Sequence, residues 1–298
     1  MSLQKRARYR SRIVHGAALL ACMFVCLLSV VSVASAAVRN ARLAKVHTFA
    51  FGIGDGALSG NVPARFRSYD LVIIDGEAAT SDQVAALHAQ GSIVLAYLDV
   101  GTIERGRGWF RRVAPYRLDL WDDWGEWYAD VAAPGFRRVI TGRVAPQMLA
   151  KGFDGLFLDN ADMVETHAAQ RVGMRRLIGR LAAMVHARSG LLFAQNGDDS
   201  VGAIATLLDG WNREDVTATY DFTSHRYVHQ SATDTRAAQE MLRRMSGLGL
   251  LTTATDYTSS RASSLARESV SNACSAGAIS FVSDIGLSRM PPVAPRCP

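Results

Sequence analysis

Eight short apolar runs recur along the chain, and segments in which apolar residues have helical spacing separate most of them. Short apolar runs bounded by turn residues are typical of buried strands. We therefore predict eight strands, of which the sixth is less clear than the others. The predicted strands cover residues 46–53, 69–75, 92–99, 155–158, 191–195, 208–211, 249–256 and 278–284.

The intervening segments predict amphipathic helices over residues 80–90, 136–150, 168–189, 234–245 and 260–276, and a last helical turn at 204–208. Alternating strands and helices imply parallel pairing through right-handed crossovers. Eight such units in about 260 residues predict an α/β fold, a single-domain (β/α)8 TIM barrel. A doubly wound open sheet is the alternative.

The first 36 residues have the organisation of a secretory signal peptide. Five basic residues precede an apolar stretch at 13–33, which ends in Ala34-Ser35-Ala36. A charged start, an apolar middle and a small-residue cleavage site define such leaders. We predict a signal peptide at 1–36, a barrel domain at 37–298 and a secreted or periplasmic protein. An uncleaved membrane anchor is the alternative, because the apolar stretch is long.

The leader accounts for the basic charge of the chain. Of 33 basic and 27 acidic residues, five basic ones lie before Ala37, which leaves 28 against 27. A near-neutral domain without a recognition motif gives no support for nucleic-acid binding. We expect a monomer that contacts membrane only if the leader is uncleaved.

Two cysteines, Cys274 and Cys297, lie outside the leader. In an oxidising compartment they could pair and tie the C-terminal tail to the preceding helix, or they could remain free thiols. No cluster of cysteine and histidine suggests zinc. We predict neither a metal nor a cofactor.

Most of the predicted strands end in an acid, and in a barrel these ends meet on the face where active sites form. A single acid after a strand can be a turn or cap residue, but six strands with acids predict a negatively charged cup. Paired carboxylates can hydrolyse a glycosidic bond, and clustered carboxylates can hold Mg²⁺ or Ca²⁺. The strand-end acids are Asp75, Asp99, Asp159, Glu214 with Asp215, Asp256 and Asp284.

A tryptophan-rich segment at 104–128 follows the third strand. Part of it should belong to the core, and part could form a platform on which sugar rings stack. The sequence does not divide the tryptophans between these roles.

Three segments carry a resemblance to a known family: AYLDVGTIE at 96–104, WGEW at 124–127 and GFDGLFLDNAD at 152–162. The chain resembles glycoside hydrolase family 114, the endo-α-1,4-polygalactosaminidase-like TIM barrels, over residues 46–284. The resemblance implies endo-hydrolysis of an α-1,4-linked galactosamine polymer with retention. The expected partner is therefore a cationic amino-sugar polysaccharide.

Carried over to this chain, the resemblance implies that Asp159 is the nucleophile and Glu214 the general acid/base. The two roles could be exchanged, and Asp215 could stand in the place of Glu214. The remaining acids would pair with ammonium groups, and two tyrosines and an asparagine would bind hydroxyls. These substrate-binding candidates are Asp75, Asp99, Asp162, Asp256 and Asp284, with Tyr97, Asn196 and Tyr257.

One position departs from the family, whose sequences often carry Ser or another small residue where Asp99 stands, so the preferred polymer could differ. Two other functions remain open: a non-catalytic carbohydrate-binding barrel, and a metal-dependent lyase or hydrolase. Nothing in the sequence requires a metal, so the latter ranks last.

Overall fold

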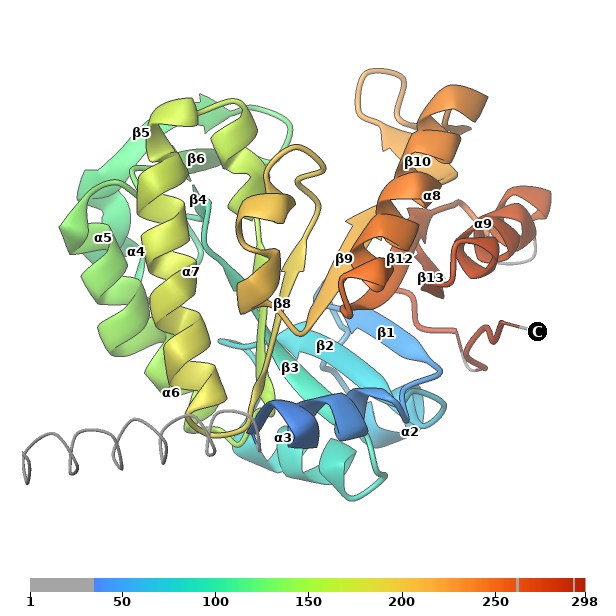
Figure 1. Ribbon diagram of the computed structural model, residues 1–298, viewed down its shortest axis with the longest axis horizontal. Helices are drawn as coiled ribbons and strands as arrows, with labels where there is room; N and C mark the ends of the chain where they lie inside the picture. Colours follow the sequence, from blue (N-terminus) through green and yellow to red (C-terminus); the bar gives the residue numbers. More distant parts are fainter. Residues whose placement is uncertain (1–34, 261–262, 292, 298) are drawn as a thin grey trace, which may run out of the picture.

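The computed structural model of the chain describes residues 35–260, 263–291 and 293–297 (Figure 1). Of the predicted leader, all but Ser35 and Ala36 lies outside these residues, so the leader stays a prediction. Across the described ranges, no helix combines the length and the apolar character that a bilayer span requires.

Eight parallel strands form one sheet whose spatial order follows the sequence, and the predicted (β/α)8 barrel is confirmed. The first and last strands of this order approach each other. The rings of Phe49 and Phe281 lie 5.6 Å apart, and the Gly54 N–H donates to the Leu287 carbonyl. The strands are β1 Phe49–Gly52, β2 Leu71–Asp75, β3 Ile93–Asp99, β7 Gly155–Asp159, β8 Leu191–Gln195, β9 Gly210–Glu214, β12 Leu251–Tyr257 and β13 Ile279–Ser283.

Each predicted strand region overlaps with one of these strands. The sixth, β9, begins two residues later than predicted and runs to Glu214. Its central residue Asn212 is fully buried and polar, which interrupts the apolar pattern of a buried strand. The seventh strand likewise buries two threonines, Thr253 and Thr255.

The helices pack around the sheet (Figure 1), and each predicted helix overlaps with an observed one, although residues 261–262 of the last lie outside the described residues. Two short helices, at 62–66 and 110–113, were not predicted. The predicted helix at 136–150 is one continuous helical segment, in which a π-helical turn at Ile140–Val144 joins α5 and α6. At the start of α3, Thr80 and Gln83 form a capping box, which fixes that end. The helices are α2 Val62–Phe66, α3 Ser81–His88, α4 Phe110–Val113, α5 Pro134–Val139, α6 Ala145–Leu149, α7 Arg171–His186, α8 Ala232–Gly247 and α9 Ser264–Ser275, with a 3-10 turn at Ala205–Leu207.

Two small antiparallel sheets were not predicted. One contains β4 Thr102–Ile103, β6 Glu126–Ala129 and β5 Arg117–Trp121, and the other pairs β10 Ala218–Asp221 with β11 Arg226–His229. Both follow the carboxyl ends of barrel strands and therefore rise above the face where sites form. Their strands are mostly partly exposed on both faces, so they lack a clear alternation of apolar and polar positions.

Two aspartates at the opposite end of the barrel join neighbouring strands. Asp154 precedes β7, accepts the N–H of Val94 in β3 at 2.8 Å and contacts His88 Nε2 at 2.7 Å. Asp209 precedes β9 and accepts the N–H of Leu192 in β8 at 2.9 Å. Asp154 belongs to the GFDG segment of the family resemblance, and its position gives that residue a structural role.

A helix at 35–43 covers this base of the barrel. Arg39 donates to Asp209 at 2.6 Å, and Arg42 donates to Asp154. Both acids are largely shielded from water, so charge-assisted bonds offset their desolvation. The N-terminal segment is thereby held on the face opposite the strand ends.

The two cysteines left open by the sequence, Cys274 and Cys297, form a disulfide that joins α9 to the C-terminal tail. We expect Cys297→Ser to lower the free energy of unfolding by roughly 3 kcal/mol, because the bridge restricts the unfolded chain. Urea unfolding of both proteins, with and without a reductant, measures the effect. The reductant should destabilise the wild type and leave Cys297→Ser unchanged; equal sensitivity of both would place the effect elsewhere.

Candidate active site

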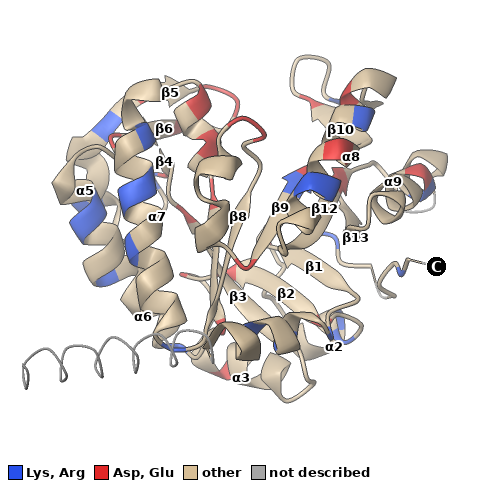
Figure 2. Cartoon of the chain, viewed as in Figure 1, with Lys and Arg blue, Asp and Glu red and all other residues tan. Residues whose placement is uncertain are grey.

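A cleft of about 350 Å³ opens at the carboxyl ends of the barrel strands. In Figure 2 acidic segments lie in the loops near β5, β6 and β8, whereas basic segments gather on the outer helices α5 and α7. The cleft is lined by Phe51, Ile53, Gly54, Tyr97, Glu104, Arg107, Trp121, Trp124, Glu126, Asp159, Asn160, Asp162, Gln195, Asn196, Glu214, Tyr257 and residues 285–287.

Two carboxylates from alternate strands share one amide group at the floor of the cleft. Asp159 ends β7, Glu214 ends β9, and Gln195 ends the strand between them. The Gln195 Nε2 group donates to Asp159 Oδ1 at 3.0 Å and to Glu214 Oε2 at 2.8 Å. The strand order therefore brings together the two acids that the resemblance singled out.

Each carboxylate also accepts a tyrosine hydroxyl. Tyr97 donates to Asp159 Oδ2 at 2.5 Å, and Tyr257 donates to Glu214 Oε1. Burial and the adjacent carboxylates raise the pKa of both tyrosines well above the usual value, so the hydroxyls remain protonated donors. Asn196 adds a third donor to Glu214, at 2.8 Å. The acids are thus fixed in orientation before any substrate arrives.

Burial raises the pKa of both carboxyl groups. The pKa of Asp159 lies well above its usual range because of desolvation, and the charges of Asp99 and Glu214 raise it further. Desolvation and the charge of Asp215 raise the pKa of Glu214 to about 7. Two buried acids this close cannot both ionise easily, so the pair retains a proton near neutral pH.

The backbone turns sharply after each of the three strands that end at this site. Asn160, Asn196 and Asp215 follow the strand-end residues, and all three adopt left-handed φ angles of 54°, 54° and 56°. Asn and Asp tolerate this conformation better than other residues with a Cβ. The turn carries the chain away at once and leaves the preceding side chain facing the cleft.

Six of the predicted site residues line the cleft: Tyr97, Asp159, Asp162, Asn196, Glu214 and Tyr257. Burial and the nearby Glu165 raise the pKa of Asp162 to about 7. Asp215 does not line the cleft, so the geometry favours Glu214 in the choice that the sequence left open.

The other four predicted acids, Asp75, Asp99, Asp256 and Asp284, do not line the cleft. Asp75, Asp99 and Asp284 accept N–H groups of the turn after their own strand, which is the capping alternative considered for single strand-end acids, whereas Asp256 accepts N–H groups of the segment that leads into β10. The donors are Glu77 and Ala78 for Asp75, Gly101 and Thr102 for Asp99, Thr217 and Ala218 for Asp256, and Ser288 and Arg289 for Asp284. The geometry therefore gives no support for direct contacts between these acids and a substrate.

Gln195, Glu104 and Glu126 are among the cleft residues that were not predicted as site residues. Burial and the charge of Asp99 raise the pKa of Glu126 to about 7. Glu126 lies in the WGEW segment of the family resemblance, which was the one available signal for it. Among the described residues, no group of three or more Asp, Glu, His or Cys side chains is arranged to hold a metal ion.

The structure divides the tryptophans between core and cleft. Trp109 is buried, whereas Trp121 and Trp124 line the cleft from the hairpin of β5 and β6. Trp124 is 46% exposed, and its ring lies 5.4 Å from that of Phe222 at the tip of the β10–β11 hairpin. The two hairpin tips thus meet beside the cleft through an aromatic contact.

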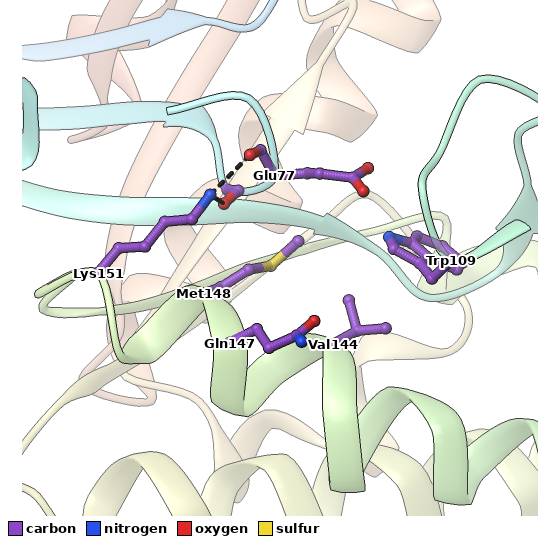
Figure 3. A pocket seen from close by; sticks show the side chains of 7 residues that line it. Glu77, Trp109, Val144, Gln147, Met148 and Lys151 are labelled. Carbon is purple, nitrogen blue, oxygen red and sulfur yellow. Dashed lines mark hydrogen bonds between the residues drawn. The ribbon is translucent and has the colours of Figure 1, made fainter. Parts of the chain in front are cut away.

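A second cavity of about 320 Å³ lies beside α6, lined by Glu77, Trp109, Met148 and Lys151 among others (Figure 3). The Lys151 ammonium donates to the carbonyls of Gly76 and Glu77 at 2.9 and 2.6 Å. The carboxylate of Glu77 accepts the Gly108 N–H at 2.8 Å. The charged groups of this second cavity, Lys151 and Glu77, are thus bonded to main-chain groups of neighbouring loops. We therefore place the chemistry in the first cleft.

The chain is similar to known proteins in sequence and in fold. The model of glycoside hydrolase family GH114 matches residues 32–288. The glycoside hydrolase domain of PelA from Pseudomonas aeruginosa is 24% identical, with a TM-score of 0.67 over 82% of this chain and 96% of that chain. Ega3 from Aspergillus fumigatus, solved in complex with galactosamine, is 16% identical, with a TM-score of 0.63 over 84% and 95%. No curated protein matches the chain significantly.

The buried acids make stability depend on pH. Their pKa values in the folded chain lie above the value near 4 of an unfolded carboxyl, so protonation favours the folded state. The stabilisation is complete below about pH 4 and is lost as pH rises through the folded values. The pKa values in the folded chain are about 7 for Glu126, Asp162 and Glu214, and about 6 for Asp215 and Asp256.

We therefore expect the free energy of unfolding to fall from pH 5 to pH 8, measured by urea unfolding at several pH values. Glu214→Gln removes one buried charge, so this variant should be more stable than the wild type at pH 8 and show a shallower dependence on pH. A stability that is constant or rises over this range would contradict the prediction.

Proposed function

The chain belongs to glycoside hydrolase family GH114, and from this membership we propose that it is a secreted endo-hydrolase of an α-1,4-linked, galactosamine-containing polysaccharide. The observation that carries the proposal is the pair of half-buried carboxylates, Asp159 and Glu214, joined through Gln195. The similarity to Ega3, solved with galactosamine, supports the class of sugar.

The spacing of the pair supports a retaining mechanism. One amide nitrogen that bonds both carboxylates, at 3.0 and 2.8 Å, keeps the two bonded oxygens no farther apart than these two lengths together. Retaining glycosidases hold their carboxyl groups about 5–5.5 Å apart, whereas inverting enzymes need about 6.5–9.5 Å to admit a water molecule. A carboxylate at this distance can reach the anomeric carbon directly.

In the first step Asp159 attacks the anomeric carbon while Glu214 donates its proton to the glycosidic oxygen, which leaves with the departing chain. In the second step Glu214 removes a proton from water, and the resulting oxygen displaces Asp159 from the sugar. A pKa of about 7 suits Glu214 for both proton transfers near neutral pH. Burial also raises the pKa of Asp159, so we assign it the ionised role on its hydrogen bonds, which it accepts from Tyr97, Gln195 and the Asn160 N–H.

The walls of the cleft suit a cationic polymer. Asp162, Glu104 and Glu126 present carboxyl groups, and Trp121 and Trp124 present ring faces on which sugars can stack. A polymer outside the cytoplasm agrees with the predicted leader at 1–36. The four acids that bind main-chain N–H groups lie outside the cleft, and Asp75 is paired with Arg107, so we assign them no direct contact with the polymer.

Reducing-end release from a partially deacetylated α-1,4-galactosaminan tests the two-carboxylate mechanism. We expect Asp159→Asn and Glu214→Gln each to lower kcat at least ~1000-fold, because each removes a group from bond cleavage. Glu240→Gln is the control: it makes the same kind of change at an exposed acid of α8, outside the cleft, and should retain activity. Polymer binding without release by the folded wild type would instead favour the carbohydrate-binding barrel.

Trp124 offers a separate test of the cleft wall. We expect Trp124→Ala to raise KM for the polymer up to about tenfold while kcat changes little, because the lost ring contacts bind sugar away from the reacting bond. Leu120→Ala is the control, since Leu120 is similarly exposed on the same hairpin but does not line the cleft. Equal effects of the two substitutions would assign the role to the hairpin rather than to the ring.

A further inference from the structure

We propose that Asn212 is a positioning residue, which fixes the end of the Gln195 amide that faces the two carboxylates. The inference rests on the proposed function, because it assigns Asn212 a role in the reaction of Asp159 and Glu214. Asn212 is fully buried, does not line the cleft and therefore acts only through its neighbour.

The orientation of the Gln195 amide follows from the charges that it faces. An amide has one donating and one accepting end, and ionised carboxylates only accept hydrogen bonds. The pair shares one proton, so at least one member can only accept, and the end within 3.0 Å of both Asp159 and Glu214 is therefore the nitrogen. Its oxygen then points into the barrel and needs a donor there.

Asn212 supplies that donor. Its Nδ2 group donates to Gln195 Oε1 at 2.8 Å. Its own oxygen accepts the hydroxyls of Thr253 at 2.8 Å and Thr255 at 3.1 Å, both from β12. Each bond fixes the orientation of the next amide, so donors run in one direction from β12 through Asn212 to Gln195 and the carboxylates.

Complete burial makes this orientation hard to reverse. Asn212, Thr253 and Thr255 are each 0% exposed, and Gln195 is 4% exposed. A reversed amide would leave buried oxygens facing oxygens, and no bulk water reaches them to compensate. Asn212, Thr253 and Thr255 occupy the barrel interior beneath the cleft. Aliphatic side chains there would pack without the cost of burying polar groups.

Reversal of the Gln195 amide would remove one donor from each carboxylate and set an oxygen against both. A hydrogen bond to an ionised acid stabilises the ionised form, so its loss makes Asp159 harder to ionise. Several titratable or charged groups surround the pair. They are Tyr97 and Asp99 of β3, Asp162 after β7, Arg213 of β9, Asp215 directly after β9, and Tyr257 of β12. None of them changes in the variants below.

The test uses Asn212→Leu, which removes the donor at similar volume, and the double variant Thr253→Val with Thr255→Val, which releases Asn212 to rotate. We expect kcat on the polymer to fall 10- to 100-fold with KM within twofold. The acidic limb of the kcat profile should move to higher pH by about one unit. The control is Thr252→Val on the same strand, whose hydroxyl lies near a main-chain carbonyl outside this network.

A second measurement does not depend on turnover. Titration of the ¹³C-labelled carboxyl of Asp159 by NMR should show a higher midpoint in both variants than in Thr252→Val and the wild type. Folded variants with an unchanged midpoint and an unchanged pH profile would overturn the inference, even if they are less stable. If the wild type releases no reducing ends but the midpoints shift as expected, the proposed substrate fails and the positioning role stands.

Discussion

The burial of two carboxyl groups side by side is the constraint on which the site depends. Asp159 and Glu214 lie among aromatic rings and strand backbone, where ionisation is costly. The barrel offsets this cost with neutral donors rather than with cations: Tyr97, Gln195, Asn196 and Tyr257. A neutral donor stabilises a negative charge without cancelling it, so the acids keep both their basicity and their capacity to exchange a proton.

Strand register delivers these donors to one level of the barrel. Asp159 pairs with Asp99 across β3 and β7, Gln195 pairs with Asn212 across β8 and β9, and Thr255 pairs with Glu214 across β9 and β12. Because side chains alternate along a strand, a slip of one residue would turn a whole set of them away from the barrel interior. The aromatic packing below, with Phe51 and Phe157 rings 4.9 Å apart, holds that register.

The family resemblance singled out the two central acids, and the pattern of the sequence predicted the barrel. It could not separate Asp159 from Asp75 or Asp256, since an acid after a strand looks the same whether main-chain N–H groups or side chains bind it. Gln195 was missed because a neutral amide carries no chemical signal until its neighbours are known. The hairpins were missed because strands exposed on both faces lack periodicity.

The helix at 35–43 determines which face of the barrel lies toward a surface that holds the chain by its N-terminal end. Arg39 and Arg42 fasten it to the base of the barrel, on the face opposite the cleft. A bead, a fused carrier or a lipid layer that holds the chain by residues upstream of this helix would therefore meet the base. The cleft would then face away from that surface, where a long polymer can reach it.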